Sequence, residues 1–325
     1  MSKIIVYGTG NYYKQNEERI KKDYEIVAYA DSKNYTSKTG DKIDDKVILS
    51  PKEISNIVYD YVLICTTFNP GNRIFQTLIK NGITSDKIKF LNRNWEYVPT
   101  EDGKGYISQL GQIRIREEHL TDFDIVHEIF VNRTYNISKL KEKTIVIDMG
   151  MNIGVASLYF AQRKEVEKVY GFEPFEDTYR QAVNNFELNE ENIKNKIVPY
   201  NFALLDKDEK CEVDITAEET GWRNIRSCSV GKNHASIEIK DAGKIISDIM
   251  NENKDSNFVL KMDVEGSEYK ILPRLLQEQL LDKVYAILME YHGDSDTIEE
   301  MLVRQGFTVF ALGESKAIGC LYAIK

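Results

Sequence analysis

The chain of 325 residues has a formal net charge of −9, with 42% hydrophobic and 29% charged residues. These values allow one large domain or two medium ones, each with a real core. The negative charge disfavours non-specific nucleic-acid binding, which needs a surplus of Lys and Arg against phosphates, so a small-molecule partner is expected.

The N-terminal residues MSKIIVYG enter an apolar strand at once, which leaves no room for a signal peptide. No apolar run approaches the length of a membrane span. The four cysteines show no C-x-x-C spacing, so the sequence indicates neither a zinc site nor a disulfide framework, and we expect reduced thiols. The prediction is a cytoplasmic protein without a membrane partner, with homo-oligomer formation left open.

Strands alternate with helical stretches twice along the chain, the pattern of βαβ units and a mostly parallel sheet. The first set has strands at 3–8, 25–30 and 59–67. It predicts a smaller Rossmann-like N-terminal domain over residues 1–98. Residues 99–143 read as a connector with a helix around Asp122 to Val131.

The first set opens on a glycine turn, VYGTGNYYKQN, with Gly8 and Gly10, and Asp31 follows the next strand. Tyr13 stands where a dinucleotide fingerprint needs a third glycine or alanine, which weakens the case for a bound pyrophosphate. We favour a domain that helps to shape the acceptor site or a dimer contact. Nucleotide binding is the alternative.

The second set covers residues 144–325 and predicts a second α/β domain. Its expected strands are TIVIDMG at 144–150, KVYGFEP at 168–174, KIVPYNFALL at 196–205, FVLKMDV at 258–264 and VYAILMEYH at 284–292. Two final apolar segments, FTVFAL and GCLYAIK, predict a closing hairpin.

The glycine turn of the second set, DMGMNIG, follows Asp148 and contains Gly150 and Gly154. Glycine permits a tight turn and close approach of a ligand, and a helix N-terminus offers unpaired N–H groups. A P-loop is excluded because no Gly-Lys-Ser/Thr follows, and the spacing does not match G-x-G-x-x-G. Glu173 ends the next strand, where a carboxylate can accept bonds from a ribose diol. S-adenosylmethionine has the ribose and a carboxylate but no phosphate, and its sulfonium is favoured beside Asp148.

Three stretches, VIDMGMNIGVASLYFA, VYGFEPFEDTYRQAVNNFELN and LKMDVEGSEYKIL, resemble the FkbM family of S-adenosylmethionine-dependent methyltransferases over residues 120–325. The resemblance implies an α/β, Rossmann-like class I methyltransferase fold with a seven-stranded, mostly parallel sheet and an antiparallel final strand. Met151 is a departure, because the family more often has alanine there.

The resemblance also implies the cofactor residues. Asp148, Gly150, Asn152 and Gly154 match the family's methionine-binding loop, and Glu173 matches its ribose acid. The adenine is expected near NFALLD, with Asn201, Phe202 and Ala203 as candidate contacts; Phe202 in the core is the competing interpretation.

Acidic residues and a histidine stand at the ends of two later strands. In open α/β sheets, ligands bind beyond the carboxyl ends of the strands. Asp263 and Glu265 follow one strand, and Glu290 and His292 end the other. An alcohol acceptor must lose a proton, so His292 is the favoured base, with Asp263 second. Asp263, Glu290 and His292 also suit a divalent metal. The alternative is that Glu265 and Glu268 cap the next helix.

The irregular stretch 217–236 is the expected acceptor segment, because long insertions are often functional. Trp222 could stack on a sugar ring, and Arg223 or Arg226 could pair with a carboxylate or phosphate. A surface loop is the alternative. The leading hypothesis is therefore O-methylation of a saccharide, glycan precursor or related small molecule. N-methylation of a glycan-linked amine, and an NAD or nucleotide enzyme using Gly8 and Gly10, remain alternatives.

Overall fold

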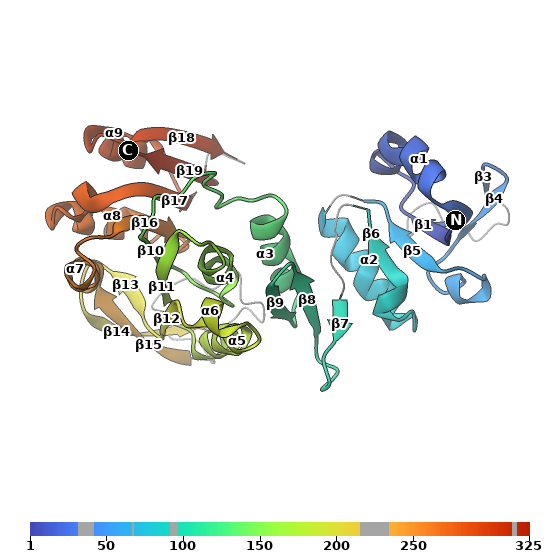
Figure 1. Ribbon diagram of the computed structural model, residues 1–325, viewed down its shortest axis with the longest axis horizontal. Coiled ribbons are helices and arrows are strands. Elements are labelled where there is room, and N and C mark those ends of the chain that lie inside the picture. Colours follow the sequence, from blue (N-terminus) through green and yellow to red (C-terminus); the bar gives the residue numbers. More distant parts are fainter. Residues whose placement is uncertain (32–41, 67, 92–96, 215–233, 314–316) are drawn as a thin grey trace. The chain divides into compact units, whose positions relative to one another are not determined.

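The structure is a computed structural model that describes residues 1–31, 42–66, 68–91, 97–214, 234–313 and 317–325. The chain forms two compact units (Figure 1). Unit 1 comprises Met1–Gly111 with Ile115–His127, and unit 2 comprises Gln112–Arg114 with Glu128–Lys325.

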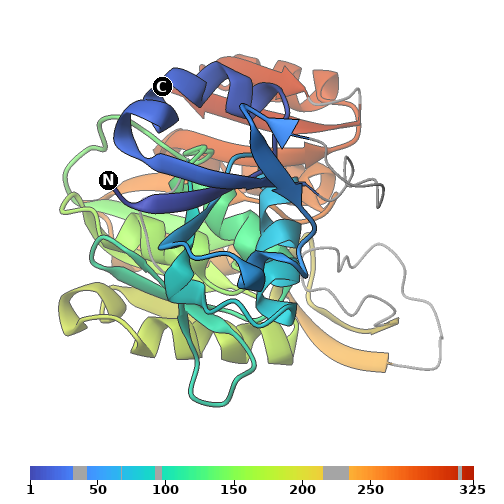
Figure 2. The ribbon, with the colours of Figure 1, turned by 90° about the vertical axis from the view of Figure 1, so that its right-hand side faces the viewer.

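Unit 1 is built on a sheet in the order β3-β4-β2-β1-β5-β6 (Figure 2). The predicted strands at its centre are present, and β1 pairs in parallel with both β2 and β5. Its elements are β1 (Lys3–Tyr7), α1 (Asn11–Asp23), β2 (Glu25–Ala30), β3 (Lys42–Ile43), β4 (Lys46–Leu49), the 3-10 turn Ile54–Asn56, β5 (Tyr61–Ile64), α2 (Phe68–Lys80), the 3-10 turn Ser85–Lys87 and β6 (Ile88–Phe90).

The segment expected to be a connector contains the predicted helix and also a small sheet that the sequence did not predict. The sheet has the order β7-β8-β9. Its short strands alternate exposed and buried residues, a weak signal next to the long apolar runs elsewhere. The elements are β7 (Tyr97–Pro99), β8 (Tyr106–Leu110), β9 (Ile113–Glu117) and α3 (Leu120–Phe130).

Unit 2 contains a seven-stranded sheet in the order β12-β11-β10-β16-β17-β19-β18. The strands from β12 to β17 pair in parallel, whereas β19 is antiparallel to both of its neighbours, as the closing-hairpin prediction requires. The elements are β10 (Thr144–Met149), α4 (Val155–Ala161), β11 (Val166–Phe172), α5 (Glu176–Glu187), α6 (Glu191–Lys194), β12 (Ile197–Tyr200), β13 (Ala203–Leu205), β14 (Glu209–Asp214), β15 (His234–Asp241), α7 (Ala242–Glu252), β16 (Asn257–Met262), α8 (Glu268–Gln277), the 3-10 turn Leu280–Lys283, β17 (Val284–His292), α9 (Asp296–Arg304), β18 (Thr308–Gly313) and β19 (Ile318–Ile324).

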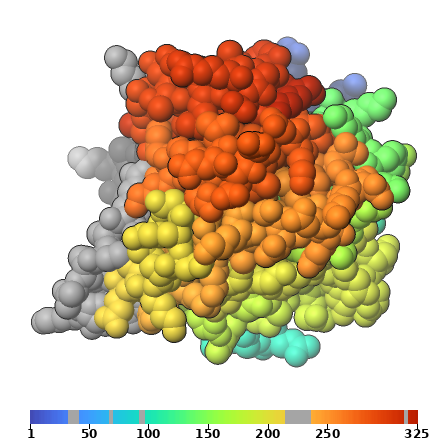
Figure 3. Space-filling model, turned by 90° about the vertical axis from the view of Figure 1, so that its left-hand side faces the viewer, coloured from blue at the N-terminus to red at the C-terminus, as the bar shows by residue number. Residues whose placement is uncertain are grey.

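The central strand β10 is buried at every residue, as expected of a parallel strand covered on both faces. On one face, Ile145, Ile147 and Met149 pack in a core with apolar residues of α7, α8 and α9. On the other, Asp148 contacts Ser157 of α4. Helices α7, α8 and α9 and the C-terminal strands form the orange and red surface of Figure 3.

One predicted strand is two strands in two sheets. The segment 196–205 forms β12 at the edge of the large sheet and then β13, which pairs with β15 in a separate sheet of order β13-β15-β14. Between them, the Asn201 side chain donates to the carbonyls of Glu173 and Pro174. These bonds hold the chain in a turn, so the strand cannot continue.

The cysteine prediction is wrong at one position. Cys65 and Cys320 are thiols outside any disulfide, as predicted, but Cys211 is disulfide-bonded. Cys228 lies outside the described residues. Spacing along the sequence carried no sign of the bond, since pairing depends on the distance between the two residues in the fold.

Among the described helices, none has the length and apolar character that crossing a bilayer demands.

Candidate active site

The turn after β10 is built around Gly150. This residue has a φ of +78°, and a Cβ there would overlap the carbonyl oxygen of Asp263. The backbone N–H of Asp263 in turn donates to the Met149 carbonyl at 3.0 Å. Glycine is therefore required both for the left-handed backbone and for the close approach of two chain segments.

The N–H groups of the turn are used inside the protein, which differs from the expectation of unpaired donors. Those of Gly150 and Met151 donate to the Phe172 carbonyl, and that of Gly154 donates to the Met151 carbonyl. The Ile153 N–H donates to the Asn152 side chain at 2.7 Å. These bonds fix the turn against the end of β11. Side chains near the turn must therefore supply most of the contacts to a ligand.

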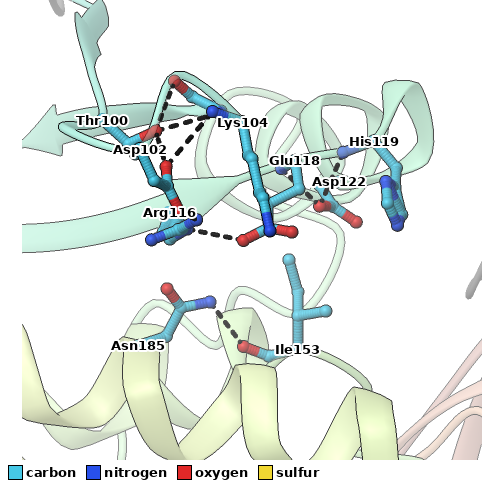
Figure 4. Close-up of polar contacts among 10 residues, drawn as sticks. Thr100, Asp102, Lys104, Arg116, Glu118, His119, Asp122, Ile153 and Asn185 are labelled. Carbon is cyan, nitrogen blue, oxygen red and sulfur yellow. Dashed lines mark hydrogen bonds and ion pairs between the residues drawn. The ribbon is translucent and has the colours of Figure 1, made fainter.

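Two further contacts fix the turn to α5. The Asn185 side chain donates to the Ile153 carbonyl at 2.9 Å (Figure 4). Gly154 has a φ of +85°, and a Cβ there would overlap the Phe186 ring. The same figure shows, in unit 1, Arg116 paired with Asp102.

Asp148, the acid expected beside a sulfonium, supports the turn from inside the protein. Its side chain is fully buried, accepts from Ser157 at 2.7 Å and lies 3.1 Å from Nζ of Lys261. That ammonium also donates to the Gly150 carbonyl at 2.6 Å. Burial lowers the pKa of Lys261, but the carboxylates of Asp148 and Asp263 raise it more, so it stays charged.

Met151 is buried and packs against the neighbouring strand. Its sulfur lies over Gly171 on the neighbouring strand, so close that a Cβ at that glycine would overlap it. Methionine fills the space that the missing side chain leaves.

Glu173 lies directly against the turn, as the sequence predicted for a ligand spanning both strand ends. One carboxylate oxygen accepts the Asn152 N–H at 3.0 Å, and the other accepts the Phe175 N–H at 3.0 Å. Asn152 adopts a φ of +51°, which asparagine tolerates well. Both carboxylate oxygens therefore help to hold the turn against the end of β11.

An aromatic group lies next to Glu173, at the predicted adenine position. The Phe172 ring stacks on Tyr200 at 5.2 Å between centroids, and Phe202 lies 5.3 Å from Tyr200. Phe202 is partly buried and packs on the main core, as the competing interpretation expected, and its contact with adenine stays a prediction. Ala203 is buried at the start of β13.

The acids and the histidine at the ends of β16 and β17 come together, as their strands are neighbours. Nδ1 of His292 lies 2.9 Å from Glu268, and Nε2 lies 3.4 Å from Glu265 and 4.0 Å from Glu290. Ligand atoms of Asp263, Glu265 and His292 lie within 4.8 Å of one another. This trio offers two oxygens and a nitrogen to a divalent ion, with Glu265 in the place expected for Glu290.

Burial and charge shift the proton affinities of this cluster. Burial raises the pKa of Glu290 to about 8, and the charges of Asp263 and Glu128 add to the rise. Burial lowers the pKa of His292, but the hydrogen bond with Glu268 and the charge of Glu265 outweigh it, so the value is about 9. At neutral pH the cluster therefore holds a protonated imidazole, with Glu290 largely neutral.

Sequence reasoning missed three residues of this site. Tyr135 is buried, and its hydroxyl lies 3.5 Å from Asp263. Burial, followed by the charge of Asp263, raises its pKa well above the ordinary value. Lys261 could have been found from the sequence, because it is a lone cation inside an apolar strand, and a buried cation needs a carboxylate partner. Glu268 was read as a helix cap, but α8 has no side-chain cap and Glu268 faces His292.

The expected acceptor residues Trp222, Arg223 and Arg226 lie outside the described residues. In unit 1, the Thr9 hydroxyl donates a hydrogen bond to the Asp31 carboxylate at 3.1 Å, so one oxygen of that carboxylate already accepts a bond within the protein. A cavity of about 510 Å³ in this unit is lined by residues that include Tyr97 and Tyr106, and by none of the glycine-turn residues.

The chain is similar to known proteins in both units. Residues 1–89 match a family model described as C2185-like, N-terminal, and residues 148–309 match one described as Methyltransferase FkbM domain. Methyltransferase 1 of Beauveria bassiana (strain ARSEF 2860) is 26% identical over 207 residues, 58% of this chain and 82% of the relative. Methyltransferase sdnD of Sordaria araneosa is 24% identical over 211 residues, 57% of this chain and 82% of the relative. The crystal structure of methyltransferase FkbM from Methylobacillus flagellatus KT aligns at 14% identity and a TM-score of 0.41, over 99% of this chain and 90% of that one.

Proposed function

Because the chain belongs to the FkbM family of methyltransferases through residues 148–309, it is a methyltransferase, and we propose that it methylates a hydroxyl group of a saccharide or related small molecule with S-adenosylmethionine. The donor supplies a methyl carbon on a sulfonium sulfur, which keeps the bonding electron pair. The observation that carries the choice of donor is Glu173, whose carboxylate lies against the glycine turn.

The residues present fit this donor at its nucleoside end. Glu173 is 6% exposed and lies against the turn, so its carboxylate is the group expected to accept hydrogen bonds from a ribose diol. The neighbouring Phe172, Tyr200 and Phe202 rings supply an apolar surface of the kind that a purine face contacts.

The acids at the ends of β16 and β17 support a hydroxyl acceptor. Asp263 and Glu265 are half-buried, so they can hold neighbouring hydroxyl groups and align one of them with the methyl carbon. Nε2 of His292 is the nitrogen that takes the acceptor's proton as the new oxygen–carbon bond forms. A divalent ion at Asp263, Glu265 and His292 is the alternative: it would orient the same hydroxyl groups, and Nε2 of His292 would then be a metal ligand instead of the base.

Replacing Glu173 by glutamine is expected to weaken binding of S-adenosylhomocysteine about tenfold to a hundredfold. The reason is that hydrogen bonds to a charged acceptor contribute about 1.5–3 kcal/mol. Isothermal titration calorimetry measures the affinity, and thermal shift with S-adenosylhomocysteine and with NAD tests the choice of ligand. Glu176→Gln is the control, because that acid is exposed and pairs with Arg180. Stabilisation by NAD without stabilisation by S-adenosylhomocysteine would contradict the proposal.

Methyl transfer is expected to increase as the pH rises from 7 to about 9, by about tenfold per pH unit at most, and then to level off. A base must be unprotonated, and the pKa of His292 is about 9. Transfer of a labelled methyl group to a panel of methyl glycosides measures the profile. His292→Asn should remove the pH-dependent part, whereas His119→Asn, at an exposed histidine, should keep it. A flat wild-type profile over this range would exclude His292 as the base.

A further inference from the structure

Glu268 is a buried acid with a single described hydrogen bond. Its side chain is fully buried at the first residue of α8, and Oε1 lies 2.9 Å from Nδ1 of His292. No hydrogen bond to Oε2 is present among the described residues. A carboxylate buried in this way costs stability unless a cation accompanies it. The imidazole of His292 is the group beside Glu268 that can supply this cation.

The geometry divides the two ring nitrogens of His292 between two environments. Nδ1 faces the buried Glu268, whereas Nε2 faces the partly exposed acids Glu265 and Glu290. A carboxylate at Nδ1 holds the proton on that nitrogen and fixes the ring orientation. Nε2 is then the nitrogen that remains able to accept a proton.

We propose that Glu268 is a positioning residue: its buried carboxylate accepts the Nδ1–H of His292 and thereby directs Nε2 of that ring toward the acceptor side of the site. The catalytic meaning of this pair rests on the proposed function, but the pair itself does not. The same contact, at 2.9 Å, places a carboxylate beside the ring, so replacing Glu268 should change the proton affinity of His292 as well as its orientation.

Other groups around the ring also affect its titration. Glu265 and Glu290 act on His292 directly, and Asp263 lies within 4.8 Å of the ligand atoms of Glu265 and His292. Glu128 of α3 acts on Glu290. A test of Glu268 must therefore leave these acids unchanged and compare one substitution at a time.

The decisive measurement is a pH titration of the imidazole nitrogens by NMR in the full-length, ¹⁵N-labelled protein without methyl donor. The chain has four histidines, and the loss of signals in His292→Asn identifies the ring. We expect the wild-type ring to titrate near pH 9 and its neutral form to carry the proton on Nδ1. A neutral ring protonated on Nε2 would overturn the proposal.

Glu268→Gln keeps an acceptor oxygen but removes the charge, so the pKa of His292 should fall by at least one unit toward its ordinary 6.5 with the same tautomer. Glu268→Leu should also abolish the tautomer preference. Glu278→Gln, at the exposed partner of Arg274 beyond the same helix, should change neither. An unchanged His292 pKa in Glu268→Gln would overturn the proposal.

Two further readouts separate positioning from a structural role. Glu268→Gln should melt below the wild-type temperature at pH 7, where it leaves the imidazolium of His292 without its buried partner, and the difference should shrink above pH 9, where the ring is neutral. This variant decides the question if Glu268→Leu does not fold. In methyl transfer, its pH profile should move to lower pH by the shift seen by NMR. A profile that stays in place would overturn the proposal, whereas failure to bind S-adenosylhomocysteine would count against the proposed function alone.

Discussion

Replacing Lys261 by methionine is expected to lower the free energy of unfolding of unit 2 by about 3–5 kcal/mol, because removing one partner of a buried ion pair leaves the other charge uncompensated. Asp148 is fully buried beside this ammonium, and the Gly150 carbonyl loses its donor in the same substitution. Equilibrium unfolding in urea measures the change.

The matched control is Lys244→Met, at an exposed lysine that pairs with Asp208. Exposed pairs contribute about 0–1 kcal/mol, so this control should stay near wild type. Adding Asp148→Asn to Lys261→Met should recover much of the lost stability, since the pair is then removed as a unit. Equal effects of the two lysine substitutions would show that the buried pair does not hold the turn.

Replacing Gly150 by alanine is expected to cost about 4 kcal/mol or more and to abolish binding of S-adenosylhomocysteine. The new methyl group would overlap the Asp263 carbonyl oxygen, which is backbone and is held by the pairing of β10 with β16. The left-handed φ of +78° adds about 1–2 kcal/mol. Urea unfolding and calorimetry measure both consequences.

Gly306→Ala separates backbone strain from overlap. Gly306 has a φ of +82°, and a Cβ there would meet nothing within 4 Å. Its substitution should therefore cost only the conformational part, about 1–2 kcal/mol, and leave ligand binding unchanged. If Gly150→Ala costs no more than this control, the close approach of the two segments is not what requires glycine.

The sequence predicted the strands that are buried on both faces, because such strands appear as continuous apolar runs. The segment at 284–292 is β17 with the predicted bounds, and the strand ending at Asp148 is present. The break between β12 and β13 was missed because it depends on the Asn201 side chain bonding to a turn distant in sequence. The short strands β7, β8 and β9 were missed because each is too short to show a period.

The sequence predicted which strand ends form the candidate site, but it did not predict which side chains pair within it. Parallel strands bring their carboxyl ends to one edge, so the grouping of Glu265, Glu290 and His292 followed from the order of the elements. The pairing of Glu268 with His292 did not, because it depends on which face of α8 turns inward. The same limit applies to Lys261, whose partner lies on another strand.

The contact between Met151 and Gly171 also bears on how sequences of this kind can diverge. The thioether occupies the volume that a side chain on the neighbouring strand would need, so the two positions behave as one site of fixed total size. A larger residue at Gly171 would therefore require the Met151 side chain to move or to be replaced by a smaller one, and Ser157 also lies close to that position. A substitution in the turn thus changes what the strand can accept, although twenty residues separate the two positions along the chain.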